Sequence, residues 1–258
     1  MTANEMANLL EEKLDRNLSF GSPGYEDFDL TSVLTEAQQL YVKKFVNELN
    51  NRESKGFQET EIRNQGLGAL IQDAPTLAVS ASQVGVIINN DISGTFFDLP
   101  MNHMYTIFEE CTINKLDCRN NQSIIAYVVQ VAHNELQRFS WSKYKKPFFN
   151  IGGDARVWRS EFARQVTGIN PAAPATGKRH EIFTDGTFNV TNYHMRYLKN
   201  PLDITVDRTT PANQRNSELD YSTHVVIVDI ASDLMLQRVK EQKMQIVEPF
   251  KELSLIHI

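Results

Sequence analysis

The residues best suited to chemistry in this chain of 258 residues are its six histidines and two cysteines. The histidines are His103, His133, His180, His194, His224 and His257. No two of them stand three or four positions apart, the spacing that places two imidazoles on one helix face for a metal ion. Six residues separate Cys111 from Cys118, which fits neither a redox CxxC motif nor a zinc knuckle. We therefore predict isolated histidines, reduced thiols, and no metal or other cofactor.

The sequence also lacks the common catalytic motifs. It contains no glycine-rich phosphate loop followed by Lys-Ser/Thr, no GxSxG nucleophile elbow and no HExxH zinc motif. Gly152-Gly153-Asp154 lies between two short apolar and aromatic runs, a pattern that favours a hairpin turn over a nucleotide loop. We predict that the chain is not an enzyme and assign no catalytic residue. A virion-associated hydrolase built from residues far apart in sequence is the least favoured alternative.

Charge is unevenly distributed along the chain, whose net charge is −6. Residues 1–73 contain 13 acidic and seven basic residues, whereas residues 138–179 contain nine basic and two acidic residues. The nine basic residues are Arg138, Lys143, Lys145, Lys146, Arg156, Arg159, Arg164, Lys178 and Arg179. The interleaved aromatic residues are Phe139, Trp141, Tyr144, Phe148, Phe149, Trp158 and Phe162.

This basic aromatic segment has two interpretations. Lysine and arginine neutralise phosphates and aromatic rings stack on bases, so residues 138–179 could bind nucleic acid. Alternatively, the aromatic residues are the inward faces of strands, and the basic residues are outward faces that meet an acidic surface of a neighbouring subunit. We favour the second interpretation because the whole chain is acidic.

With 41% apolar residues, the chain can bury a substantial core. No apolar run approaches the length of a membrane span, and the N-terminus does not resemble a secretion signal. We expect a protein made inside a cell, with no membrane association.

Apolar periodicity predicts helices near the N-terminus. The first carries a stripe of Ala7, Leu10, Leu14 and Leu18, with Asn4 as the expected cap. The second is expected to begin at the capping box Thr35-Glu36-Ala37-Gln38, and a third to run over Phe57–Ile71.

A long helix is predicted over Ser217–Lys243, with Ser217 as its cap and basic residues in its last turns. The run Val225–Val228 makes its middle apolar nearly all round. Such a helix packs either within one core or also against a copy of itself. The segment after it, Gln245–Ile258, is predicted to be an extended tail that frays or adds a strand to a partner.

The middle of the chain is predicted to be rich in strands. Thr76–Asn90 contains many β-branched residues, and Ile124–Val131 is the clearest strand. Shorter strands are expected near residues 105–107, 148–151, 157–162, 181–183, 187–190, 194–198 and 204–206.

These patterns predict an α+β fold in which the N-terminal helices and the long C-terminal helix form a helical bundle interrupted by a β-rich insertion. The expected parts are a helical part at 1–75, the insertion at 76–215, the long helix at 216–244 and the tail at 245–258.

Two stretches resemble the head-to-tail connector, or adaptor ring, proteins of crAss-like short-tailed phages. Phe28–Leu70 is similar to their N-terminal helices. Asn192–Gln237 is similar to a region in which a Tyr-Leu-Lys-x-Pro-x-Asp-Ile phrase, here Tyr197–Ile204, precedes an acidic-capped helix. The two stretches cover roughly a third of the chain.

The resemblance implies a structural subunit of a homo-oligomeric, typically twelvefold ring in the virion tail, at the portal vertex. Such a ring docks on the portal protein, contacts other tail ring or tail tube proteins, and passes genomic DNA only as transient cargo during ejection. Assembly would take place in the cytoplasm of the bacterial host. The expected portal contacts, by analogy with terminal arms of such adaptors, are Phe250, Leu253, Leu255 and Ile256. The expected contacts between subunits are Lys143, Lys145, Lys146, Arg156 and Arg159. A nucleic-acid-binding module that uses residues 138–179 is the main alternative.

Overall fold

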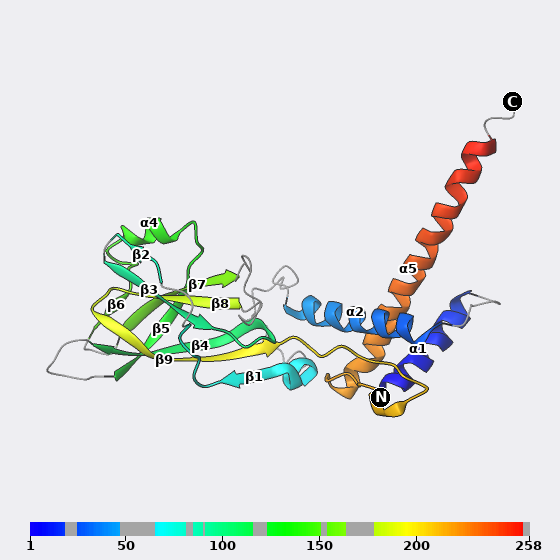
Figure 1. Cartoon of the computed structure of the whole chain (residues 1–258), viewed down its shortest axis with the longest axis horizontal. Helices are drawn as coiled ribbons and strands as arrows, with labels where there is room; N and C mark the ends of the chain where they lie inside the picture. The colour runs from blue at the N-terminus through cyan, green and yellow to red at the C-terminus, as the bar shows by residue number, and fades with distance from the viewer. Residues whose placement is uncertain are drawn as a thin grey trace, which may run out of the picture. The chain divides into compact units, whose positions relative to one another are not determined.

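The structure is a computed structural model, and it describes residues 1–18, 25–46, 65–80, 85–89, 91–115, 123–150, 154–163 and 178–254 (Figure 1). The chain divides into two compact units. The helical unit comprises Met1–Leu70 and Asn200–Ile258, and the sheet unit comprises Ile71–Lys199. The fold is mixed α+β, as predicted, and a large sheet is its main element.

Helix α1 spans Ala3–Leu18 and buries one apolar stripe. The fully buried residues of this stripe are Ala3, Met6, Ala7, Leu10 and Leu14. Its N-terminus is a capping box, because the Glu5 amide donates to Thr2 Oγ1 at 3.2 Å and the Thr2 amide donates to Glu5 Oε2 at 2.9 Å. The prediction that Asn4 is the cap was wrong, since its side-chain amide donates to the Asp207 carbonyl at 3.2 Å.

Helix α2 spans Asp27–Val46 and begins well before the predicted capping box at Thr35. Its first turn contains Asp27 and Asp29, and carboxylates near the free N–H groups of a helix N-terminus stabilise the helix. Thr35 and Gln38 therefore lie inside the helix. Thr35 donates to the Ile204 carbonyl at 3.2 Å and Gln38 to the Leu202 carbonyl at 2.8 Å. The motif thus fastens the segment that leads to the last helix, and no helix begins there.

Helix α5 spans Tyr221–Ser254 and begins after Asp220. Asp220 Oδ1 accepts from the amide and hydroxyl of Ser222 at 2.9 and 2.6 Å, and these bonds lower the pKa of Asp220. Ser217, the predicted cap, uses its hydroxyl to donate to Gln38 Oε1 at 2.6 Å. The prediction that Ser217 caps the helix was therefore wrong. The cap is Asp220, whose carboxylate is the acceptor nearest the free N–H groups of the first turn.

The predicted extended tail was wrong for residues 245–254, which continue α5. The residues before Pro249 include strong helix formers, and the helix continues through Pro249 although this residue lacks a backbone donor and its ring crowds the carbonyl four residues earlier. Residues 255–258 lie outside the described residues.

Helices α1 and α2 each pack against α5, which buries Ile227, Val228 and Ala231. These two packings do not confirm the expected helical bundle. Within the described ranges, no helix is both long and apolar enough to cross a membrane.

The sheet unit contains one nine-stranded sheet in the order β1-β9-β4-β5-β7-β8-β3-β2, with β6 paired to β7. Neighbouring strands are antiparallel except β5 and β7, which are parallel. The strands are β1 Ile71–Ala74, β2 Ile87–Ile88, β3 Ile92–Asp98, β4 His103–Lys115, β5 Ser123–Gln130, β6 Phe148–Phe149, β7 Ala155–Ala163, β8 Lys178–Thr184 and β9 Phe188–Lys199.

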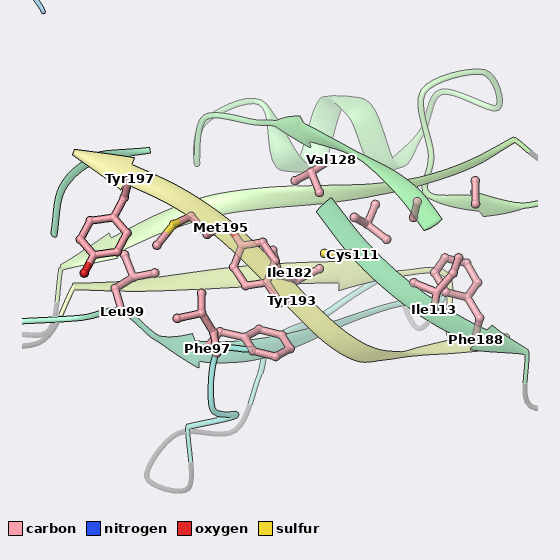
Figure 2. Packing of buried hydrophobic residues seen from close by; sticks show 14 residues of the cluster. Phe97, Leu99, Cys111, Ile113, Val128, Ile182, Phe188, Tyr193, Met195 and Tyr197 are labelled. Atoms are coloured by element: carbon pink, nitrogen blue, oxygen red, sulfur yellow. The ribbon is translucent and has the colours of Figure 1, made fainter. Parts of the chain in front are cut away.

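The segment after β1 links the two ends of this sheet. The Leu77 amide donates to the Tyr193 carbonyl on β9 at 3.0 Å, and the Ser80 amide donates to the Phe96 carbonyl on β3 at 2.7 Å. The sheet thereby curls around a core to which most strands contribute (Figure 2). The core includes Phe97, Leu99, Cys111, Ile113, Val128, Ile182, Phe188, Tyr193, Met195 and Tyr197.

Most predicted strands exist, with different bounds. Those near residues 105–107, 124–131, 148–151, 157–162 and 181–183 correspond to β4 to β8, and those at 187–190 and 194–198 are two halves of β9. The described part of Thr76–Asn90 contributes only β2 and a single bridge at Val79. The strand expected at 204–206 is one bridge, Thr205 to Arg215. Of the predicted helix Phe57–Ile71, residues 57–64 lie outside the described residues, and the 3₁₀ helix η3 (Gly68–Leu70) leads into β1.

Strand β3 was missed because Gly94 interrupts its apolar pattern. A Cβ at position 94 would lie 2.3 Å from Glu181 Oε1, so the position needs a residue without a side chain. Glu181 Oε1 in turn accepts from the Val86 amide at 2.9 Å, and burial raises the pKa of Glu181. The glycine thus makes room for a buried carboxylate on the neighbouring strand.

Candidate assembly surface

The first part of the basic aromatic segment belongs to a short helix and the loop that follows it, ahead of strands β6 and β7. Helix α4 spans Leu136–Ser140. Leu136 is buried, and the Phe139 ring packs on Trp158 with ring centroids 6.3 Å apart. These apolar contacts hold α4 on strand β7, so the loop that follows is anchored at its start.

Two side chains of β7 hold the backbone of this loop. Trp158 Nε1 donates to the Lys145 carbonyl at 2.8 Å, and Arg156 Nη2 donates to the Lys146 carbonyl at 2.8 Å and also to the Tyr144 carbonyl. With its carbonyls turned toward β7, the loop presents side chains to solvent. Trp141 is 75% exposed and Tyr144 is 87% exposed.

Arg156 lies between aromatic side chains of two other strands. It pairs in register with Tyr127 on β5 and with Phe148 on β6, and its guanidinium lies 5.1 Å from the Phe148 ring centroid. Partial burial lowers the pKa of Arg156. Tyr127 is exposed and so is Ile125, two residues before it on the same face. We call Ile125, Tyr127, Trp141, Lys143, Tyr144, Lys145, Phe148 and Arg156 the cationic aromatic surface.

The predicted subunit contacts divide between this surface and the interior. Lys143 and Lys145 are exposed, and Lys145 Nζ lies 4.2 Å from the Phe139 ring centroid. Lys146 Nζ lies 3.5 Å from Asp91 Oδ2. Arg159 is different, because it is 5% exposed and lies inside the curled sheet.

Arg159 belongs to a buried polar network inside the sheet unit. Its Nε lies 3.2 Å from Glu109 Oε1, and its Nη1 donates to His180 Nε2 at 2.9 Å. Since that imidazole nitrogen accepts, Nδ1 carries the proton and donates to Tyr193 Oη at 2.6 Å, and Tyr193 donates to Glu109 Oε2 at 2.6 Å. The directions of all these bonds agree.

The pKa shifts in this network follow from burial. Burial raises the pKa of Glu109 and of Tyr193, and it lowers the pKa of His180 to about 2. Burial and the nearby charges of Lys178 and Arg159 lower the pKa of His103 to about 4. Both imidazoles are therefore neutral, and Arg159 serves as the buried counter-charge of Glu109.

The aromatic prediction was right for some positions and wrong for others. Trp158 is buried as expected, but Trp141 and Tyr144 point outward, and the basic residues Arg159 and Arg179 are buried. Arg179 Nε pairs with Asp98 Oδ1 at 2.6 Å. On β7 the consecutive residues Val157, Trp158, Arg159 and Ser160 are all buried, because Trp158 packs under α4 on the face opposite Val157. Trp141 and Tyr144 lie in the loop, where strand alternation does not apply.

The predicted portal contacts lie at the C-terminal end of the chain. Positions 250 and 253 lie in the last turns of α5, and Leu255 and Ile256 lie outside the described residues. Within the described residues, no group of three or more His, Cys, Asp or Glu side chains is arranged as metal ligands would be.

Sequence reasoning did not single out the exposed apolar residues Phe28, Ile125 and Tyr127. The only signal for Phe28 was its place among acidic residues, where a core residue is not expected. Tyr127 lies in the most apolar strand and reads as core, because one sequence does not show which face of a strand is covered.

Comparison with known proteins gives two matches. Residues 1–245 match the family described as phage tail ring protein 3/4. The chain is 22% identical over 212 residues to ring protein 4/5 of Bacteroides phage crAss001, and the match covers 79% of this chain and 75% of that protein.

Proposed function

The chain belongs to the phage tail ring protein 3/4 family, and from that premise we propose that its ring docks on the portal and continues the DNA channel into the tail. Membership of the family makes the chain a structural component of a tail ring in the virion. The proposal adds a twelvefold ring at the portal vertex, assembled in the host cytoplasm, with other tail ring or tail tube proteins as further neighbours.

The observation that best supports a ring contact is the cationic aromatic surface on an otherwise acidic chain. Lys143, Lys145, Lys146 and Arg156 border exposed aromatic side chains, while residues 1–73 contain 13 acidic residues and seven basic residues. Two different surfaces of opposite charge favour a head-to-tail contact between copies, and such contacts close into rings. We leave Arg159 out of this interface because it is buried.

A net charge of −6 also suits a conduit. Phosphate contacts would hold a moving duplex, whereas a channel of low positive charge lets DNA pass as transient cargo. The role requires no catalysis.

The first test measures the mass and shape of the purified full chain, alone and mixed with the portal protein, by light scattering and negative-stain microscopy. We expect rings with a central hole, either free or formed on the portal. A chain that stays monomeric under both conditions contradicts the proposal.

The end of α5 is the proposed portal contact, through Phe250, Leu253, Leu255 and Ile256. Deletion of residues 249–258 should abolish portal docking while the number of subunits in the free ring stays unchanged. A shorter deletion of residues 255–258 is the matched control and should weaken docking less. Full docking after the longer deletion refutes this contact.

DNA binding by residues 138–179 is the second candidate, favoured by the exposure of Trp141 and Tyr144 beside Lys143. It predicts DNA affinity that falls steeply with salt and is lost when Lys143, Lys145 and Lys146 are changed to Glu. The exposed Lys43 on α2 offers a control, since Lys43→Glu changes charge outside the segment.

A further inference from the structure

The first turn of α2 carries an exposed aromatic residue among acids. Phe28 is 77% exposed, and its neighbours Glu26 and Asp29 are exposed as well. Phe28 does not belong to the buried stripe of the helix, which consists of Leu30, Val33, Leu34, Ala37, Tyr41 and Val42. The helical unit therefore presents an aromatic ring that its own core does not use.

This turn is held in place by contacts within the helical unit. The Arg208 amide donates to Asp27 Oδ2 at 3.1 Å, and the Arg208 guanidinium pairs with Glu11 Oε2 on α1 at 2.9 Å. One turn further on, the Val206 amide donates to Thr31 Oγ1 at 2.9 Å. Because the segment 206–208 holds this turn at two positions and is itself paired with α1, binding through Phe28 would order little new structure.

The cationic aromatic surface complements this turn in charge and in residue type. Trp141 and Tyr144 offer two exposed rings, and the exposed Lys143 and Lys145 lie beside them. Trp, Tyr and Arg are the residues most enriched among those that dominate binding energy at protein interfaces. A second cationic surface would be repelled, whereas an acidic turn would be attracted.

We propose that the first turn of α2 in one subunit docks on the cationic aromatic surface of the next copy of this chain. Phe28 packs against Trp141 and Tyr144 of that copy, and Glu26 and Asp29 face its lysines. This inference rests on the proposed ring and names the contact that closes it. The two surfaces differ, so the contact is head-to-tail, and each subunit uses one surface on each side.

Two complementary variants test the contact in the full chain. The turn variant carries Glu26→Gln, Phe28→Ala and Asp29→Asn. The surface variant carries Trp141→Ala, Lys143→Gln, Tyr144→Ala and Lys145→Gln. Each variant loses one side of the contact and keeps the other. We expect each to be monomeric alone and the equimolar mixture to form a 1:1 dimer, as measured by light scattering and analytical ultracentrifugation.

The controls separate this contact from folding and from general surface effects. All the exchanged side chains are exposed, so the circular dichroism spectra of both variants should match that of the wild type. Leu202→Ala, which removes another exposed apolar side chain of the helical unit, should leave self-association unchanged. Phe28→Ala alone should weaken self-association about tenfold or more.

The outcomes distinguish the contact from the ring itself. Rings formed by either variant alone overturn the contact and leave the ring proposal standing. If the wild-type chain stays monomeric, both alone and with the portal protein, the contact and the ring proposal are both refuted. The contact is refuted if the mixture forms no dimer while the wild type binds DNA in a salt-dependent manner and the surface variant does not. That result assigns the cationic aromatic surface to nucleic acid.

Discussion

Removal of Arg159 should destabilise the sheet unit more than removal of any exposed ion pair. The Arg159 side chain is 6% exposed and that of its partner Glu109 is 14% exposed. In Arg159→Met, the buried carboxylate loses its counter-charge and His180 Nε2 loses its donor. Breaking a buried pair by removing one partner costs about 3–5 kcal/mol, and we expect a loss in this range.

The protein supplies its own probe for this measurement. Its two tryptophans, Trp141 and Trp158, both lie in the sheet unit. Trp158 is 1% exposed, so its fluorescence in urea reports the unfolding of this unit, and Trp141→Phe removes the exposed fluorophore. Arg196→Met is the control, because Arg196 is 58% exposed and its ion pair with Asp73 should contribute little.

A double mutant tests the pairing itself. Glu109→Gln removes the charge that Arg159 balances, so the combined variant should lose about 1–3 kcal/mol less than the sum of the two single losses. A loss below about 1 kcal/mol in Arg159→Met, or additive losses, would refute the view that this pair supports the interior of the sheet.

The loss should also depend on pH. Burial raises the pKa of Glu109 and the charge of Arg159 opposes that rise. A carboxyl group whose pKa is higher in the folded state destabilises the fold as the pH rises from the unfolded toward the folded pKa. Without Arg159 the gap between the unfolded and folded pKa of Glu109 widens. The stability lost in Arg159→Met should therefore be larger at pH 8 than at pH 5. Arg159 also lowers the pKa of His180, which works in the same direction.

Three further predictions concern other parts of the chain. His194 lies 2.8 Å from Asp73 Oδ1 and 3.0 Å from Glu110 Oε1, and these carboxylates raise its pKa. The stabilisation from these two His194 contacts is therefore fully present below pH 6.5 and is lost as the pH rises through the raised pKa of His194. Hydrogen-exchange protection of β1, which contains Asp73, should fall over that pH range. Gly94→Ala should destabilise the sheet unit by about 1–3 kcal/mol in urea, followed by tryptophan fluorescence. Ile227→Ala, at a fully buried position of α5, should cost the helical unit about 2–5 kcal/mol, followed by circular dichroism.

The sequence predicted best those elements whose pattern and environment agree. The stripe of α1 was predicted because one face is apolar and the other charged, and Leu10 and Leu14 are fully buried. Helix starts were predicted poorly at Asn4, Thr35 and Ser217, because each side chain is engaged by a residue far away in sequence. Local rules for caps cannot anticipate such partners.

The sequence predicted which residue types form the cationic aromatic surface, but it did not predict how these residues are arranged. Lys143 and Lys145 are exposed as expected, but the outward position of Trp141 follows from a backbone held by Trp158 and Arg156. These hydrogen bonds join a loop to a strand, and no periodicity in the sequence encodes them. The same holds for the interior, where Arg159 finds Glu109 across strands distant in sequence.

The difference between Arg156 and Arg159 bears on how the ring subunits attract one another. Composition assigns nine basic residues to residues 138–179, yet Arg159 and Arg179 are buried and paired with Glu109 and Asp98. Fewer cations therefore face solvent than the sequence suggests, and the surface that remains is largely aromatic. Attachment through apolar rings depends weakly on salt, whereas attachment to phosphates depends on it steeply. Self-association should consequently change little between 50 and 200 mM salt, on the order of threefold or less, where phosphate binding through three or four cations would change by about 10².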